Sequence, residues 1–258
     1  MILAIDIGNT TVALGGIKDG RVCFVAHMDT VRTRTAAEYR AEMEKVFSHR
    51  RHPERPVRFE GAVLTSVVPQ ITGALAECAR HYTGKKPVIV SPDIRTGLTM
   101  GVPDPHAVGK DRLVDAAYAA ANFPLPVVTV DLGTATTFTH VSDKGVVDSG
   151  VITTGIRAGA AALWGDTAQL PEVEITRPDT ILGTNTKTCM QAGLYYTFLG
   201  GVERTIRQFR KELGGEDFKV ITTGGLGRVF ENDTELIDVY DPDLIFKGMA
   251  HIYSRNVK

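Results

Sequence analysis

Two short segments of the 258-residue chain could bind an anion together with a cation. In residues 6–11 and again in residues 131–136, an aspartate is followed two residues later by glycine and then by threonines. Glycine lets the backbone turn tightly and brings N–H groups close to an anion, and threonine hydroxyls add donors. Aspartate repels a phosphate, but it can hold a cation, usually through water, and the cation can contact the phosphate. One such turn is also typical of a plain hairpin, whereas two at matched positions on facing domains predict a site for the phosphates of a nucleotide.

A diglycine late in the chain could form a third part of the same site. Gly224 and Gly225 follow an apolar stretch at residues 218–222. A flat backbone surface at this point could carry an adenine ring. A strand-to-helix turn that needs glycine at positive φ explains the pair as well. The chain has no GxxxxGK[ST] motif, so the predicted phosphate site is not a P-loop.

Residues 109–112, with the sequence GKDR, open an alanine-rich stretch that predicts a helix. Asp111 can accept a proton from a hydroxyl group during phosphoryl transfer. Arg112 can pair with a substrate carboxylate through two parallel hydrogen bonds. Asp115 follows Asp111 by four residues and so shares its helix face. Taken by itself, the Asp111–Arg112 pair is also consistent with a solvated pair of charges.

Strands and helices predicted from the hydrophobic pattern must position these segments. Apolar, β-rich stretches predict strands at 1–7, 11–17, 21–27, 61–65, 87–90, 127–131, 136–141, 146–149, 218–222 and 236–240. Helices are expected at 35–49, 70–82, 106–122, 156–167, 186–213 and 242–256. The Asp19-Gly20 pair predicts a tight hairpin, and the basic residues between 50 and 55 predict an exposed loop. Strands that alternate with helices after an antiparallel hairpin indicate a mixed sheet covered by helices.

The chain repeats itself at a constant offset of 125 residues, the separation of Asp6 and Asp131. At this offset three further pairs match, namely Thr11 with Thr136, Gly20 with Gly145 and Val22 with Val147. A period of this length indicates two related domains and not a solenoid of short repeats. The predicted domains are residues 1–117 and 118–258.

The composition excludes several classes of protein. The chain is 43% hydrophobic and 23% charged, which is typical of a soluble globular protein. Its net charge is −1, so no global positive field attracts nucleic acid or an anionic membrane. Three cysteines without a CxxC pair argue against a disulfide framework or a structural zinc site, and the scattered histidines argue against a transition-metal site. No apolar run reaches the roughly 20 residues of a membrane span, and no signal peptide is recognisable. A soluble, cytoplasmic α/β protein is expected.

Six segments in this order resemble type III pantothenate kinases, a branch of the actin-like, sugar-kinase and Hsp70-like ATPase superfamily. They cover nearly the whole chain and are Asp6-Ile7-Gly8-Asn9-Thr10, Ser66-Val67-Val68-Pro69, Gly109-Lys110-Asp111-Arg112, Asp131-Leu132-Gly133-Thr134-Ala135-Thr136-Thr137, Leu182-Gly183-Thr184-Asn185-Thr186 and Thr223-Gly224-Gly225. The resemblance implies two ribonuclease-H-like domains with a cleft between them, and a homodimer. It implies ATP-dependent phosphorylation of pantothenate to 4'-phosphopantothenate, the first step of coenzyme A synthesis.

The resemblance also implies a role for each matching residue. ATP contacts are implied for Asp6, Ile7, Gly8, Asn9, Thr10, Thr11, Val12, Ala13 and Thr134. Pantothenate contacts are implied for Gly109, Lys110, Asp111, Arg112 and Thr186. Asp111 would be the proton acceptor, Asp6 the carboxylate on the magnesium side, and Asp131 a ligand of a monovalent cation, potassium or ammonium.

Two departures from the family pattern concern the acceptor side of the site. Val102 stands where the family has a tyrosine nine residues before the catalytic aspartate. Residues 149–155, with the sequence SGVITTG, replace a GGxIxPG segment. Two alternatives therefore stay open: a kinase for another small hydroxy-acid or pantetheine-like substrate, and a catalytically weak accessory or regulatory protein of the same fold. The intact set of aspartates favours a kinase.

Overall fold

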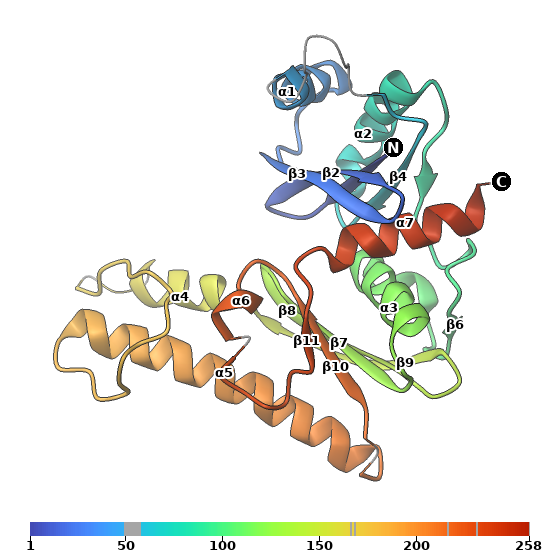
Figure 1. Ribbon diagram of the computed structural model, residues 1–258. Helices are drawn as coiled ribbons and strands as arrows, with labels where there is room; N and C mark the ends of the chain where they lie inside the picture. The colour runs from blue at the N-terminus through green and yellow to red at the C-terminus, as the bar shows by residue number, and fades with distance from the viewer. Residues whose placement is uncertain (49–57, 166, 168, 216, 231, 258) are drawn as a thin grey trace. The chain divides into compact units, whose positions relative to one another are not determined.

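The computed structural model describes residues 1–48, 58–165, 167, 169–215, 217–230 and 232–257 (Figure 1). The loop expected between residues 50 and 55 lies outside these residues. The chain divides into two compact units. Unit 1 comprises Met1–Ala121 together with Asp243–Lys258, and unit 2 comprises Asn122–Pro242.

Unit 1 is built on a mixed sheet with the strand order β3-β2-β1-β4-β5. Its strands are β1 (Ile2–Ile7), β2 (Thr11–Lys18), β3 (Arg21–Asp29), β4 (Gly61–Ser66) and β5 (Val88–Ile89). The central strand β1 pairs antiparallel with β2 and parallel with β4, so Asp6 lies opposite Ala13 on one side and Thr65 on the other. The predicted hairpin is confirmed, because Asp19 (φ 51°) and Gly20 (φ 74°) form a tight turn with positive φ.

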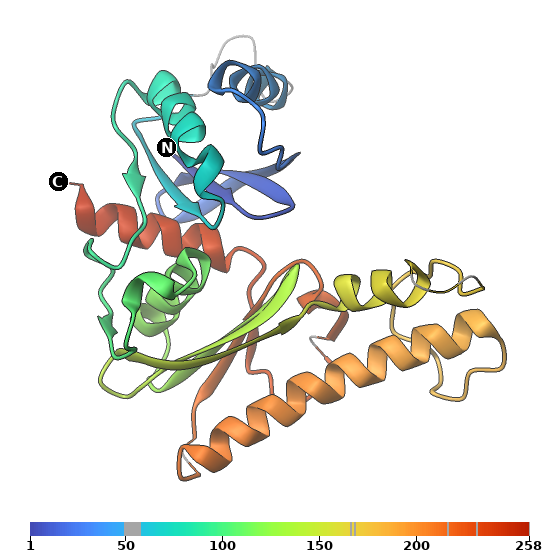
Figure 2. The ribbon, with the colours of Figure 1, turned by 180° about the vertical axis from the view of Figure 1, so that it is seen from behind.

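Helices cover both faces of this sheet, and Figures 1 and 2 show α2 and α7 on opposite sides of it. The helical elements of unit 1 are α1 (Ala36–Ser48), α2 (Pro69–Thr83), the 3₁₀ turn η1 (Pro105–Ala107), α3 (Lys110–Asn122) and α7 (Leu244–Asn256), and the short strand β6 spans Thr99–Met100. Leu3 and Ile5 of β1 pack in one buried cluster with α1 and α2. Ile2 and Ala4 pack in a second cluster with α3 and α7. Because side chains alternate along a strand, Asp6 belongs to the face of Ala4.

The last helix packs with unit 1, although it follows unit 2 in the sequence. Phe246, Met249 and Ile252 of α7 are buried in the same cluster as Ala4 of β1 and Val63 of β4. Chain order had placed residues 242–256 in the second predicted domain, because it cannot show which sheet an amphipathic helix covers. The domain boundary at residues 117 and 118 stays a prediction.

Unit 2 repeats the sheet of unit 1 in the order β11-β10-β7-β8-β9. Its strands are β7 (Val127–Leu132), β8 (Ala135–Val141), β9 (Val146–Thr154), β10 (Lys219–Thr223) and β11 (Val239–Tyr240). Asp131 lies opposite Thr137 of antiparallel β8 and Thr223 of parallel β10. The helices are α4 (Ile156–Gly165), α5 (Thr186–Glu212) and α6 (Gly227–Phe230), and α5 buries Tyr195 and Ile206 against the sheet. The predicted fold class, α/β with two mixed sheets flanked by helices, is confirmed.

The two sheets differ at the turn after the aspartate. Asp6 pairs with Ala13, seven residues later, whereas Asp131 pairs with Thr137, six residues later. The second turn is therefore one residue shorter, and the counterpart of Thr11 at the start of β2 is Ala135 and not Thr136. The match of Thr11 with Thr136 thus holds for the sequence but not for the strand register.

Most predicted strands and helices are confirmed to within a few residues, with two informative differences. The helix expected from residue 106 begins at Lys110, because Pro105–Ala107 forms a separate 3₁₀ turn and Val108 is extended (φ −71°, ψ 129°). The strand expected at 146–149 continues to Thr154, since the β-branched residues that follow pair along the whole of β8. Within the described part of the chain, no helix combines the length and apolar character needed to cross a membrane.

Candidate active site

Thr30, the residue that follows β3, supports the turn between β1 and β2. The N–H of Gly8 donates to the carbonyl of Thr11 at 3.0 Å, which closes the turn. The Thr30 hydroxyl donates to the carbonyl of Gly8 at 2.7 Å, and the Thr30 N–H donates to the carbonyl of Thr10 at 3.0 Å. The side chains of Asn9 and Thr10 are exposed. The turn is thus rigidly supported while its outer surface is open to solvent.

Side chains of residues 6–13 point in two directions. Ile7 and Val12 are fully buried in the cluster formed with α1 and α2, so a ligand could contact only their backbone. Asp6 is half-buried and lies on the opposite face, next to Ala13 in register. A carboxylate thus lies at the end of a central strand beside a turn whose residues Asn9 and Thr10 are exposed, and its role toward a phosphate and a cation stays a prediction.

The start of α3 positions Asp111 and Arg112. Because the helix begins at Lys110, Asp111 lies in its first turn, where the helix dipole favours negative charge. Asp111 Oδ1 accepts a hydrogen bond from the Arg112 N–H at 2.8 Å. A methyl group on Gly109 would lie 2.5 Å from the same oxygen, so glycine is required for this carboxylate position. Burial lowers the pKa of the Arg112 guanidinium, and the neighbouring Asp111 opposes that shift.

Lys110, a predicted substrate contact, has backbone partners in this structure. Its Nζ donates to the carbonyl of His106 at 2.8 Å and to that of Val108 at 3.2 Å. The ammonium thereby ties the 3₁₀ turn to the first turn of α3. This contact stabilises the segment that carries Asp111, whatever role Lys110 has toward a substrate.

In unit 2, the structure brings Asp131 and Gly224 together. Gly224 has a φ of +90°, and a methyl group on its Cα would lie 2.6 Å from Asp131 Oδ1 and 2.7 Å from the carbonyl oxygen of Leu132. A carboxylate oxygen and a backbone carbonyl oxygen therefore share one small niche above Gly224. Oxygen ligands of this kind suit a hard cation. The structure thus offers donor oxygens where the sequence analysis expected a monovalent cation.

The backbone around this niche is fixed by several hydrogen bonds. The carbonyl of Gly224 accepts from the Tyr240 hydroxyl at 3.2 Å and from the Gly227 N–H at 3.1 Å. The Gly155 N–H donates to the carbonyl of Thr134 at 3.1 Å. Thr134 and Gly225 remain exposed, and no atom would lie within 4 Å of a methyl group on Gly225. The surface above Gly225 is open, and its role as an adenine platform stays a prediction.

Thr186 is the first residue of α5 and is exposed. The helix start is well formed, because the side chain of Asn185 accepts from the Thr188 N–H while the Thr188 hydroxyl accepts from the Asn185 N–H. This reciprocal pair of Asn185 and Thr188 is a capping box. Thr186 is therefore presented at the positive end of a 27-residue helix.

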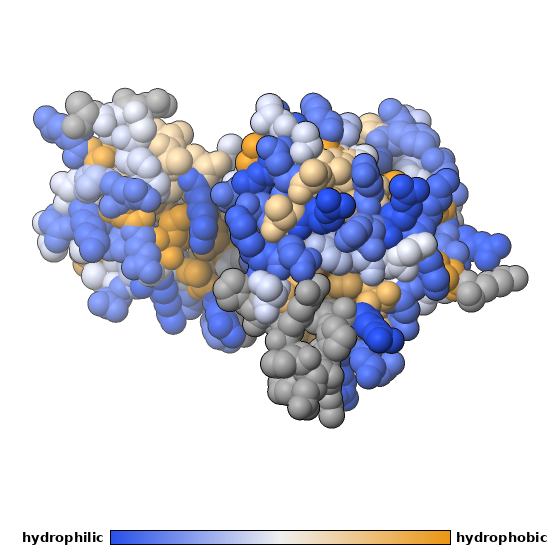
Figure 3. All heavy atoms as spheres, turned by 90° about the horizontal axis from the view of Figure 1, so that it is seen from above, coloured by the Kyte–Doolittle hydropathy of each residue, from blue (hydrophilic) through white to orange (hydrophobic). Residues whose placement is uncertain are grey.

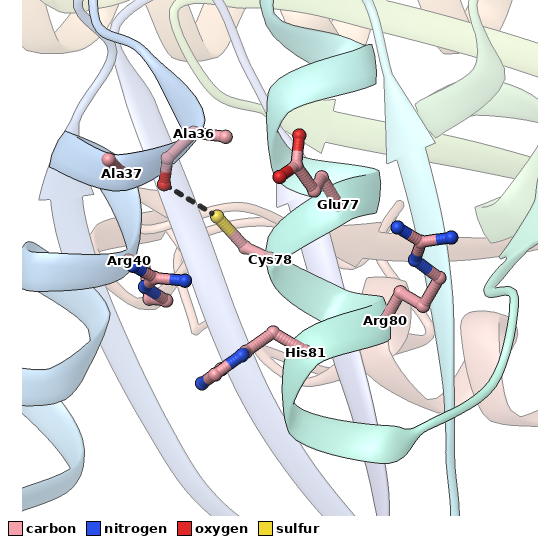
Figure 4. A pocket seen from close by; sticks show the side chains of 7 residues that line it. All are labelled: Ala36, Ala37, Arg40, Glu77, Cys78, Arg80 and His81. Carbon is pink, nitrogen blue, oxygen red and sulfur yellow. Dashed lines mark hydrogen bonds between the residues drawn. The ribbon is translucent and has the colours of Figure 1, made fainter.

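A cavity of about 260 Å³ lies apart from these predicted residues, between α1 and α2. Arg40, Cys78 and His81 line it, and the Cys78 thiol donates to the carbonyl of Ala36 at 3.2 Å (Figure 4). Among the described residues, no group of three or more histidine, cysteine, aspartate or glutamate side chains could hold a metal ion.

Three residues that no sequence motif marked lie at the site. Thr30 and Tyr240 hold the turns at Gly8 and Gly224, and Thr65 lies beside Asp6 in the sheet. The first two make their contacts across 22 and 16 residues of chain. No local motif marks such contacts, so only the tertiary structure could identify them.

Solved structures show which fold this arrangement has. A protein from Campylobacter jejuni described as a Baf family transcriptional activator superposes with a TM-score of 0.59 at 18% identity, covering 98% of both chains. A protein from Sinorhizobium meliloti described as a 2-dehydro-3-deoxygalactonokinase gives 0.56 at 14% identity, with 98% and 96% coverage. MreB 5 of Spiroplasma citri, bound to AMPPNP, gives 0.53 at 8% identity, with 96% and 94% coverage. The chain has the duplicated fold of the actin-like ATPases and sugar kinases.

Sequence comparison identifies the branch within that class. A model of the type III pantothenate kinase family matches residues 2–208. A type III pantothenate kinase of Bifidobacterium longum is 63% identical over the full length of both chains. Relatives with the same description from Agathobacter rectalis and Bacillus cytotoxicus are 41% and 37% identical, each covering 99% of this chain and 97% of their own. The chain belongs to the type III pantothenate kinase family.

Proposed function

We propose that the chain transfers the γ-phosphoryl group of ATP to the hydroxyl of pantothenate, giving 4'-phosphopantothenate for coenzyme A synthesis. Full-length similarity to proteins described as type III pantothenate kinases carries the proposal. The placement of Asp111 and Arg112 in the first turn of α3 supports it from the structure. Phosphoryl transfer requires positioning, charge neutralisation and a proton acceptor, and this chain has groups suited to each task.

Asp111 and Arg112 act on pantothenate in this proposal. The Asp111 carboxylate accepts the proton of the attacking hydroxyl, and Gly109 leaves the space that its oxygen needs. Arg112 pairs with the carboxylate of pantothenate. Thr186 supplies a further contact from the start of α5. Lys110 can join them only when its ammonium leaves the carbonyls of His106 and Val108.

We assign ATP contacts to residues 6–13, through the exposed backbone and side chains of that turn, and to Thr134 in unit 2. Gly224 and Gly225 form the surface for adenine. Magnesium would be held by Asp6, whose half-buried carboxylate fits a water-mediated contact. Potassium or ammonium would be held by Asp131 with the Leu132 carbonyl, the oxygens that meet above Gly224. These cations supply charge neutralisation when bound.

We also propose that the protein is a cytoplasmic homodimer. Among its described residues, unit 2 exposes six large hydrophobic residues between positions 151 and 196. Figure 3 shows hydrophobic side chains at the surface of the molecule. The six residues, with exposed fractions from 38% to 76%, are Val151, Ile152, Leu163, Ile181, Leu182 and Tyr196. Exposed hydrophobic side chains that gather into a patch are typical of subunit interfaces. Light scattering of the purified protein gives the mass that decides between monomer and dimer.

The test of the enzymatic proposal is ADP release with pantothenate, measured with and without potassium, for the wild type and Asp111→Asn. The substitution keeps the size of the side chain but removes the proton acceptor, so kcat should fall by at least about 100-fold. The thermal midpoint should be nearly unchanged, which separates catalysis from folding. Full activity of the variant would remove Asp111 from its role. Absence of turnover by the wild type with potassium and with ammonium would refute the proposed function.

A further inference from the structure

A threonine hydroxyl is buried beside Asp6 without a visible structural use. Thr65 lies in β4 with a side chain that is 0% exposed. Its Oγ1 has no hydrogen-bond partner among the residues that the structure describes. In this respect it differs from the neighbouring Ser66, whose hydroxyl is within 2.7 Å of the Thr72 hydroxyl.

The sheet register directs Thr65 toward the predicted magnesium side of the site. Asp6 and Thr65 are paired residues of the parallel strands β1 and β4, so their side chains emerge on the same face. The contacts of Ala4 and Val63, two residues earlier on these strands, place that face toward α3 and α7. The same strand pair in unit 2 sets Asp131 beside Thr223. An aspartate with a threonine at its side thus occurs at the end of the central strand in both sheets.

Packing alone does not explain a threonine at this position. Burying a hydroxyl without a partner costs free energy, and valine has the same shape without that cost. Valine is also at least as favourable in a strand, and β4 already holds Val63 and Leu64 at buried positions. A hydroxyl in such a place is available for a hydrogen bond that forms only when a ligand binds.

We propose that Thr65 is a positioning residue of the nucleotide site. Its hydroxyl donates a hydrogen bond to the Asp6 carboxylate when ATP and its metal ion bind, and so holds that carboxylate in the orientation that receives them. A hydroxyl has one proton to donate, and a carboxylate offers up to four acceptor positions, so the bond is compatible with a metal contact on the same side chain. This inference rests on the proposed function for the role of Asp6, but it concerns nucleotide binding and not the choice of acceptor.

The experiment compares Thr65→Val with Thr65→Ser. Calorimetric titration with ATP in the presence of magnesium measures binding without turnover, and steady-state kinetics gives KM for ATP and for pantothenate separately. Thr65→Val should weaken ATP binding about fivefold, as expected for one hydrogen bond, with the KM for pantothenate unchanged. Thr65→Ser keeps the hydroxyl and should bind ATP within twofold of the wild type. The thermal midpoint of ligand-free Thr65→Val should equal or exceed that of the wild type, because an unpaired buried hydroxyl has been removed.

Several results would overturn the role of Thr65. Unchanged ATP affinity in Thr65→Val would do so, as would an equal loss in Thr65→Ser. A Thr65→Val protein that unfolds, or that loses ATP and pantothenate binding together, would show a structural role. Failure of the proposed function can be told apart from failure of the Thr65 proposal. A wild-type protein that binds ATP but does not phosphorylate pantothenate would refute the proposed function. The ATP affinities of the two Thr65 variants would still decide the role of Thr65.

Discussion

Replacing Gly224 by alanine should destabilise unit 2 and disturb the Asp131 niche. The backbone at Gly224 has a φ of +90°, where an L-residue is strained by about 1–3 kcal/mol. The added methyl would also lie 2.6 Å from Asp131 Oδ1 and from the carbonyl carbon of Leu132. Relieving that overlap by moving a strand end costs about 1–3 kcal/mol more. The free energy of unfolding should therefore fall by about 2–6 kcal/mol.

Urea unfolding followed by tryptophan fluorescence suits this test, since the one tryptophan of the chain, Trp164, lies on α4 in unit 2. With an m value of about 2 kcal/mol/M, the midpoint should fall by about 1–3 M. Gly225→Ala is the matched control, because the methyl would meet no atom within 4 Å and φ is not positive there. Its free energy of unfolding should stay within about 0.5 kcal/mol of the wild type.

Gly224→Ala should also need more potassium for half-maximal activity, because the added methyl displaces the Asp131 carboxylate oxygen that is assigned to the cation. Equal midpoints for Gly224→Ala and Gly225→Ala would refute the geometric argument. If the urea midpoint of Gly224→Ala falls while its potassium requirement is unchanged, the backbone at Gly224 is strained as expected, but the cation does not bind in this niche.

Two further predictions concern unit 1. Burial raises the pKa of the Cys78 thiol to about 11, with Glu77 adding to the shift, so about one thiol in 1,000 is ionised at pH 8. Mass spectrometry after brief iodoacetamide treatment at pH 8 should find the exposed Cys23 and Cys189 modified and Cys78 intact; equal labelling of all three would contradict this. Met249→Ala removes a fully buried side chain of α7 and should cost about 2–5 kcal/mol, with faster hydrogen exchange in β1 and β4. Ser254→Ala, exposed on the same helix, is the control, and unchanged exchange in Met249→Ala would argue against the packing of α7 on this sheet.

Much of the fold and of the site could be predicted locally. The apolar run before Asp6 and the Asp-Gly turn at residues 19 and 20 each depend on neighbouring residues only. The start of α3 was harder to predict, because a 3₁₀ turn and an extended Val108 interrupt a stretch whose composition suits a continuous helix. The one-residue difference between the two aspartate turns could not be seen in the sequence, because Thr11 matches Thr136 in residue type although the strand register sets Thr11 against Ala135.

The sequence by itself determined the strands, the two aspartate turns and the membership of a kinase family, because these follow from hydrophobic period, turn chemistry and motif order. Tertiary structure decided which residues meet. Helix α7 packs on the sheet of unit 1, Gly224 lies next to Asp131, and Thr65 is paired with Asp6 on the neighbouring parallel strand. Each of these contacts joins residues far apart in the chain, and their formation depends on shape and register across a sheet, which no local pattern records.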